Sequence, residues 1–283
     1  MSKKKENCIF ISANRSFLKL LKMCLFSISQ NYPNHPDILL CHTDFTEHDL
    51  QEIGKITDRI IPIPNTLGTH EIWPIMSHLP RNLDPRVFYA RFLVRKWWIF
   101  DNYQNVLHLD ADVLVVKNLD ILMHYDEFFV VQESYAGDDK IFKDHNDPHL
   151  LQQLKKDAIT LWNVAINGWI FLVPPIYRTQ KHHQELIYLL SSYKSYIQRA
   201  DQSIINTRIY KNNIPIQKDF NYNFQHRLIL NPLYDNWLIN AHIIHFNWIN
   251  EKHRINCMKK MLHLSKTQDY PEKYRIYYHD LVM

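Results

Sequence analysis

The sequence contains few of the residues on which several common protein classes depend. Only 4 of its 283 residues are glycine, and the glycine-rich loops that cradle phosphates in P-loop and dinucleotide-binding proteins are missing. Its 4 cysteines are scattered, with no Cys-x-x-Cys pair. That spacing argues against a zinc ribbon or a disulfide framework and favours a reducing compartment. A bound nucleotide would therefore have to be held in another way.

Long apolar runs and a strong net charge are missing as well. No stretch approaches the ~20 apolar residues of a membrane-spanning helix, and the apolar stretch at Cys8 is too short for a signal peptide. We therefore predict a cytoplasmic protein without a transmembrane segment, for which peripheral membrane contact stays open. The formal net charge of +4 is spread along the chain, which argues against a nucleic-acid binder with a clustered basic face.

The composition and its periodicity predict an α/β fold. Hydrophobic residues make up 46% of the chain and aromatic residues 13%, enough for a substantial core. Short apolar runs alternate with amphipathic segments in the N-terminal part, which indicates a βαβαβ unit with a Rossmann-like, mainly parallel sheet flanked by helices. Strands are predicted at residues 8–12, 37–41, 59–63, 128–132, 165–173 and 214–217, and helices at 17–28, 46–56, 84–100, 150–156, 176–193 and in the tail from 257.

The segment NVLHLDADVLVVKNLD, residues 105–120, is the central feature. An apolar run ends on Asp110-Ala111-Asp112, and a second apolar run follows at once. Buried carboxylates need a positive partner, open α/β sheets bind ligands at the carboxyl ends of their strands, and residues i and i+2 of a strand share a face. The pair therefore predicts a Mn²⁺ or Mg²⁺ site. Ala111 leaves room for a bulky ligand, and a solvated turn is the structural alternative.

HLDADVLVVKNLD resembles the metal-binding segment of the retaining glycosyltransferases of family 8, which include glycogenin and bacterial lipopolysaccharide galactosyl- and glucosyltransferases. His108 stands where that family often has tyrosine. The resemblance implies the GT-A, or nucleotide-diphospho-sugar transferase, fold in a single domain. Its nucleotide- and metal-binding half would span 6–132, its acceptor and donor-sugar half 133–265, and a helical tail 266–283.

Further motifs carry over from the family residue by residue. The end of the first strand holds the nucleotide base and ribose there, which implies that role for Ser12, Ala13 and Asn14. The family's Tyr-x-Arg matches Tyr89 and Arg91, whose guanidinium suits a phosphate or a sugar hydroxyl cluster. Two alternatives stay open from the residues alone: Asn14 as a turn or cap residue, and Arg91 as the partner of an acid at the sheet end.

Two motifs beyond the metal segment concern the donor sugar. The family's Asn-Ala/Ser-Gly segment is shortened here to Asn167-Gly168, which implies a donor-binding role for Asn167. The family's Asp-Gln-Asp motif matches Asp201 and Gln202, with Ser203 in place of the second aspartate. The resemblance makes Asp201 and Gln202 the candidate catalytic residues beside the sugar, and a helix N-cap is the structural alternative for Asp201.

The last motif is AHIIHFNWINEK, residues 241–252. Family 8 enzymes carry His-Phe-x-Gly-x-x-Lys-Pro-Trp at this point, where the histidine is the third protein ligand of the metal and the lysine contacts the diphosphate. The resemblance implies that His245 completes the metal site, although a lone histidine after a strand is often structural. Trp248 replaces the glycine, and the lysine falls one position late at Lys252, where His253 or Arg254 could substitute.

Together the motifs predict a Mn²⁺-dependent retaining glycosyltransferase, with Mg²⁺ as the alternative ion. By resemblance it moves a hexose from a UDP-sugar donor to a glycan or glycoprotein acceptor, without nucleic acid, and a homodimer is compatible with it. Two other classes stay open: a metal-dependent phosphoryl- or nucleotidyl-transfer enzyme, and an inactive sugar-binding module with the same fold. The candidate residues are Asp201 and Gln202 for catalysis, Asp110, Asp112 and His245 for the metal, and Ser12, Ala13, Asn14, Tyr89, Arg91, Asp110, Ala111, Asp112, Asn167 and Lys252 for the nucleotide sugar.

Overall fold

The computed structural model describes residues 5–64, 102–125, 129–132, 141–160, 166–198, 200–214, 224–247, 249, 251–267 and 270–282. Within these ranges the main sheet has six strands in the order β3-β2-β1-β4-β7-β6. Strands β3, β2, β1 and β4 are mutually parallel, whereas β7 runs antiparallel to both β4 and β6. The strands are β1 Lys5–Ala13, β2 Asp37–His42, β3 Ile60–Pro64, β4 Tyr103–Leu109, β6 Phe129–Gln132 and β7 Ile166–Val173.

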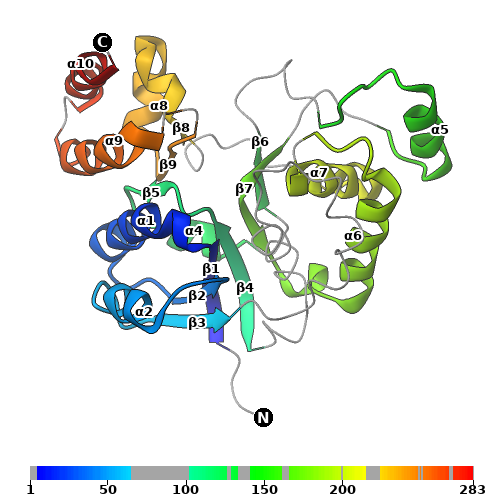
Figure 1. Ribbon diagram of the computed structural model, residues 1–283, viewed down its shortest axis with the longest axis horizontal. Helices are drawn as coiled ribbons and strands as arrows, with labels where there is room; N and C mark the ends of the chain where they lie inside the picture. Colours follow the sequence, from blue (N-terminus) through cyan, green and yellow to red (C-terminus); the bar gives the residue numbers. More distant parts are fainter. Residues whose placement is uncertain are drawn as a thin grey trace.

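Helices cover both faces of this sheet (Figure 1). The helices α1 (Leu18–Asn31) and α2 (Glu47–Gly54) lie on one side, and α6 (Gln180–Tyr193) and α7 (Ala200–Asn212) lie on the other. Two separate core clusters result, because alternate residues of a strand point to opposite faces. This two-sided burial explains why the strands are nearly continuous apolar runs. The predicted mainly parallel α/β sheet is confirmed.

A second, smaller sheet carries the C-terminal part of the chain. It contains β5 (Val113–Val115), β9 (Ile243–His245) and β8 (Phe224–Gln225), in the order β5-β9-β8. The helices α8 Asp235–Asn240, α9 Glu251–Leu264 and α10 Tyr270–Val282 gather beside it (Figure 1) and share a third core cluster with it. Helices α9 and α10 lie in the part of the chain from residue 257 for which helix was predicted, although α9 already begins at Glu251.

Local sequence signals explain where several helices begin. Thr46 is the N-cap of α2, and its hydroxyl accepts a hydrogen bond from the Asp49 amide while the Asp49 carboxylate accepts one from the Thr46 amide. This reciprocal capping box satisfies two amides that the helix itself leaves unpaired. Asp147 caps α5 (Pro148–Lys156) by accepting hydrogen bonds from the amides of His149 and Leu150, without the reciprocal bond. The helix predicted at 46–56 is therefore present, with Thr46 as its cap.

The helix predicted at 176–193 starts later than expected. Residues Pro175–Tyr177 form a single 3-10 turn, and α6 begins at Gln180 with Thr179 as its N-cap. Thr179 has an extended backbone, and its hydroxyl accepts a hydrogen bond from the His182 amide at 3.3 Å, so the regular helix begins only after this residue. Other short elements are α4 Asp120–Met123 and the 3-10 turns Arg15–Phe17, His226–Leu230 and Pro232–Tyr234.

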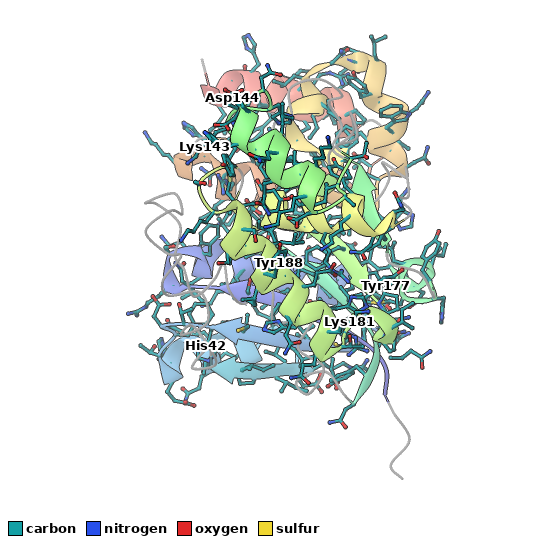
Figure 2. All side chains as sticks on the ribbon, turned by 90° about the vertical axis from the view of Figure 1, so that its right-hand side faces the viewer. His42, Lys143, Asp144, Tyr177, Lys181 and Tyr188 are labelled. Carbon is teal, nitrogen blue, oxygen red and sulfur yellow. The ribbon has the colours of Figure 1, made fainter. Side chains whose placement is uncertain are left out.

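A buried arginine ties α7 to α6. Arg208 of α7 donates a hydrogen bond from Nε to Glu185 Oε2 at 3.1 Å, and its guanidinium lies 5.9 Å from the centroid of the Tyr177 ring. Figure 2 turns this layer towards the viewer, with Tyr188 on α6 and Lys181 and Tyr177 near the start of that helix. Because a buried charge is stable only while it is paired, this contact fixes the register of α7 against α6.

Several predicted elements lie outside the described residues. These are the helix at 84–100 with Tyr89 and Arg91, and residues 215–217 of the strand predicted at 214–217. Ile214 follows α7 without regular secondary structure. In the described part of the chain, no helix combines the length and the apolar character that crossing a membrane requires.

Candidate metal centre

The paired acids lie in a turn between two strands of different sheets. Strand β4 ends at Leu109 and β5 begins at Val113, so Asp110-Ala111-Asp112 joins the main sheet to the small one. The expectation that both acids share one face of a strand is therefore wrong, because the chain leaves the extended conformation at residue 110. Both carboxylates are nevertheless buried. The bend of the backbone at this turn brings the two carboxylates together, whereas in a strand the alternation of side chains would do so.

The third candidate ligand arrives from the distant end of the chain. Strand β9 pairs antiparallel with β5 and places His245 opposite Val113. The Phe246 amide continues the ladder by donating to the Asp112 carbonyl at 3.0 Å. As a result His245 Nε2 lies 3.2 Å from Asp112 Oδ1, across a sequence separation of 133 residues. One ligand atom from each of Asp110, Asp112 and His245 lies within 4.8 Å of the other two.

An arginine supplies positive charge to this cluster. Arg254, in the first turn of α9, donates from Nη1 to Asp112 Oδ2 at 3.0 Å and from Nη2 to the Ile249 carbonyl at 3.4 Å. Lys252, the expected diphosphate contact, is exposed instead and lines a cavity of about 670 Å³ together with Arg15 and Lys19. The sequence named Arg254 only as a substitute for Lys252, and the structure places it directly against Asp112.

Two further side chains surround Asp110. The His108 Nε2 atom lies 3.5 Å from Asp110 Oδ1, and its ring stacks on Phe171 with centroids 4.5 Å apart. The Cys24 thiol donates to the Asp110 carbonyl at 3.8 Å. Burial raises the pKa of this thiol, and the nearby charges of Asp112 and Asp110 raise it further. Cys24 thus stays a neutral donor, and sequence reasoning assigned neither residue to the site.

The end of β1 lies beside the acid turn. Ile11 pairs with Leu109 of β4, so Ser12 and Ala13 are level with the residues that follow β4. Ser12 is buried, and its hydroxyl has no hydrogen-bond partner among the described residues. Asn14 forms a local turn, in which its Oδ1 accepts from Ser16 Oγ at 2.6 Å. The turn role that the sequence left open for Asn14 is therefore present in the structure.

The candidate catalytic helix packs closely on β7. A Cβ atom added to Gly168 would lie 2.9 Å from the Gln202 Cβ and 3.3 Å from its Cα. Only glycine permits this approach without a shift of the helix. Gly168 thus places the buried Gln202 side chain near the start of β7, which lies beside the carboxyl end of β4. Sequence reasoning named Gly168 only as a motif position, without this packing role.

The other predicted site residues are described in part or not at all. Helix α7 begins at Ala200, so Asp201 lies inside its first turn and not at the cap position of the structural alternative. The side chains of Asp201 and Asn167 lie outside what the structure describes, as do Tyr89 and Arg91 entirely.

Comparisons with known proteins agree with this geometry. The family model described as Glycosyl transferase family 8 matches residues 8–252. A structure of the galactosyltransferase LgtC with donor and acceptor sugar analogs has a TM-score of 0.65 at 16% identity and covers 95% of this chain and 99% of LgtC. An active-site mutant of LgtC has a TM-score of 0.64 at 14% identity, covering 89% of this chain and 95% of that one.

The apo form of the glycosyltransferase GlyE from Streptococcus pneumoniae TIGR4 is also similar. It has a TM-score of 0.59 at 14% identity and covers 98% of this chain and 64% of GlyE. A search among curated proteins gave no match. At these low identities the solved structures show a shared fold, whereas the family model covers most of the chain.

Proposed function

The chain belongs to glycosyl transferase family 8 and is a glycosyltransferase with the GT-A fold, and on this premise we propose that it uses Mn²⁺ to transfer a hexose from a UDP-sugar. Mg²⁺ is the alternative ion. The acceptor is a glycan or a protein-linked glycan, and the anomeric configuration is retained. The observation that carries the proposal is the convergence of Asp110, Asp112 and His245 within 4.8 Å.

The chemistry of these donors fits a divalent cation. Two carboxylates and one imidazole are a normal ligand set for Mn²⁺, whereas Mg²⁺ is held mainly by oxygen ligands. Three protein ligands leave coordination positions open for the oxygens of a diphosphate. The two buried carboxylates also need nearby positive charge, which a cation between them would supply. Both points support a cation between the two acids.

The bound cation would act as a Lewis acid on the diphosphate leaving group, where negative charge develops as the bond to the sugar breaks. Arg254 would add fixed positive charge there, because its planar guanidinium fork matches phosphate oxygens. It takes over the role that the family resemblance implied for Lys252. Lys252 itself stays a candidate for the outer part of the nucleotide, in the cavity that it lines with Arg15 and Lys19.

Side chains around the turn would hold the rest of the donor. The unpaired, buried Ser12 hydroxyl beside the acid turn supports the role of residues 12–14 in binding the base and ribose. Gln202 and Asp201, at the start of α7, would steady the sugar as it becomes oxocarbenium-like. Tyr89, Arg91 and Asn167 stay in the proposal through the family motif alone.

Thermal unfolding with and without Mn²⁺ and UDP tests the proposal. We expect Mn²⁺ and UDP together to raise the unfolding midpoint of the wild-type protein, and slow hydrolysis of a UDP-sugar in a donor panel to follow. In Asp112→Asn the rate of UDP-sugar hydrolysis should fall by at least about 100-fold, and Mn²⁺ should no longer shift the unfolding midpoint. His245→Ala should weaken Mn²⁺ binding about tenfold or more.

Asp280→Asn, on an exposed carboxylate of α10, is the matched control. It makes the same chemical change away from the cluster and should behave like wild type. If Asp112→Asn keeps both the Mn²⁺-dependent shift and the hydrolysis, the metal assignment is wrong. If wild type binds Mn²⁺ and UDP but hydrolyses no UDP-sugar, the inactive sugar-binding alternative is favoured. The family assignment already decides against the phosphoryl-transfer alternative.

A further inference from the structure

A buried amide side chain without hydrogen-bond partners lies two residues after His245. Asn247 is 8% exposed, and among the described residues neither its Oδ1 nor its Nδ2 has a hydrogen-bond partner. An amide side chain offers two N–H donors and an oxygen with two lone pairs. Burying these groups unpaired is costly, and more than nine in ten buried polar groups in proteins are paired. The bare amide therefore indicates a ligand that pairs with it when bound.

The backbone places Asn247 at the edge of the candidate metal centre. Phe246, the preceding residue, is held to the acid turn by its amide, which donates to the Asp112 carbonyl at 3.0 Å. On the other side, the Ile249 carbonyl accepts a hydrogen bond from Arg254, which itself pairs with Asp112. Asn247 thus lies on the short segment that connects His245 to Arg254, and both of these side chains contact Asp112.

We propose that Asn247 binds a hydroxyl group of the transferred hexose and helps to select the donor sugar. The proposal rests on the proposed function, because it takes the acid turn as the place where the diphosphate joins the sugar. The amide lacks both a donor and an acceptor partner, so its complement has to donate and accept at once. A sugar hydroxyl does both, whereas a phosphate oxygen only accepts and a cation would pair only with Oδ1.

This role has a consequence for specificity. A buried site that is built to hydrogen-bond a substrate hydroxyl rejects an analogue without that hydroxyl strongly, because the protein group is then left unpaired. In the free protein the buried amide of Asn247 is already unpaired, which costs free energy. A hexose that presents its hydroxyl to the amide removes the penalty, and an epimer that turns the hydroxyl away does not. The residue should therefore discriminate between hexoses and not between nucleotides.

The test compares binding of UDP with binding of UDP-hexoses in the presence of Mn²⁺. Asn247→Leu, which has nearly the same size without polar atoms, should bind UDP within about twofold of wild type. It should bind the preferred UDP-hexose, taken from UDP-glucose and UDP-galactose, about tenfold more weakly. Its unfolding midpoint in chelator should be unchanged or about 2 °C higher, because an unpaired buried amide has been removed. Calorimetric titration and thermal unfolding give these values.

Asn236→Ala, an exposed asparagine of α8, is the control and should match wild type in every measurement. Equal weakening of UDP and UDP-hexose would assign Asn247 to the nucleotide and overturn the proposal. An unchanged ratio of UDP affinity to UDP-hexose affinity would also overturn the proposal. If the unfolding midpoint falls while this ratio is unchanged, Asn247 has a structural role. If the wild-type protein binds no UDP in the presence of Mn²⁺, the proposed function itself fails. That result is distinct from an unchanged affinity ratio in Asn247→Leu, which overturns only the role of Asn247.

Discussion

Arg254 should affect metal binding and nucleotide binding in opposite directions. Its guanidinium donates to Asp112 Oδ2 at 3.0 Å, and the two side chains are only 19% and 12% exposed. In the free protein Arg254 therefore provides positive charge to an acid that the cation also needs. Arg254→Gln keeps most of the length and a hydrogen-bond donor but removes the charge, and Arg254→Lys keeps the charge as a control.

The magnitude follows from Coulomb's law. Two unit charges about 4 Å apart interact by about 4 kcal/mol at an effective dielectric constant of about 20, which we discount to about 2 kcal/mol for partial exposure. Without Mn²⁺, Arg254→Gln should thus lower the unfolding midpoint by about 4 °C. Mn²⁺ alone no longer competes with a fixed cation, so we expect it to bind about tenfold more tightly, a gain of about 1.4 kcal/mol.

UDP at saturating Mn²⁺ should show the reverse effect. The diphosphate loses one charge-assisted contact, so its affinity should fall about tenfold in Arg254→Gln. Titration calorimetry with Mn²⁺ alone, and then with UDP at saturating Mn²⁺, separates the two effects. Arg254→Lys should stay close to wild type for Mn²⁺ and lose part of the UDP affinity, because lysine lacks the planar fork. Weaker binding of Mn²⁺ alone by Arg254→Gln would refute the reasoning, since it would make Arg254 a support of the metal site.

Two further predictions concern packing and pH. Gly168→Ala places a methyl group 2.9 Å from the Gln202 Cβ, so α7 has to shift. The kcat for UDP-sugar hydrolysis should fall about tenfold or more, and the free energy of unfolding should fall by about 1–2 kcal/mol. An unchanged kcat would mean that this contact does not position the candidate catalytic helix. Burial lowers the pKa of His226, which lies 2.7 Å from the Tyr274 hydroxyl, to about 3, whereas an unfolded histidine titrates near 6.5. Only the unfolded state gains a proton between these values, so His226 should cost about 1.4 kcal/mol of stability per unit as the pH falls from 6 to 4. Urea unfolding of wild type and His226→Gln at several pH values measures this loss, and a free-energy difference between them that does not vary with pH would contradict the assigned pKa.

The strand and helix pattern was predictable because its signals are local. Ile9 and Ile11 alternate with Phe10 within β1, and the Thr46–Asp49 capping box lies within four residues, so neither signal depends on a distant segment. The later start of α6 has an equally local signal in its N-cap Thr179, which the helical periodicity of residues 176–193 concealed.

The candidate metal ligands were predictable as residues, but their arrangement in space was not. Asp110 and Asp112 followed from their apolar flanks and the family motif, yet the structure joins them through a turn and not along a strand face. The role of Arg254 was one of three options in the sequence, because the altered segment after His245 has no fixed spacing to the acids. Only the placement of α9 showed that Arg254 contacts Asp112.

By itself the sequence determined the α/β class, the family motif and the residues able to bind a cation, because composition, periodicity and short motifs depend on neighbours along the chain. The tertiary structure decided which of them meet. The pairing of β5 with β9 brings His245 to Asp112 across 133 residues, and it leaves the Asn247 amide buried beside them. Such contacts depend on the packing of whole sheets and helices, which no local pattern of residues encodes.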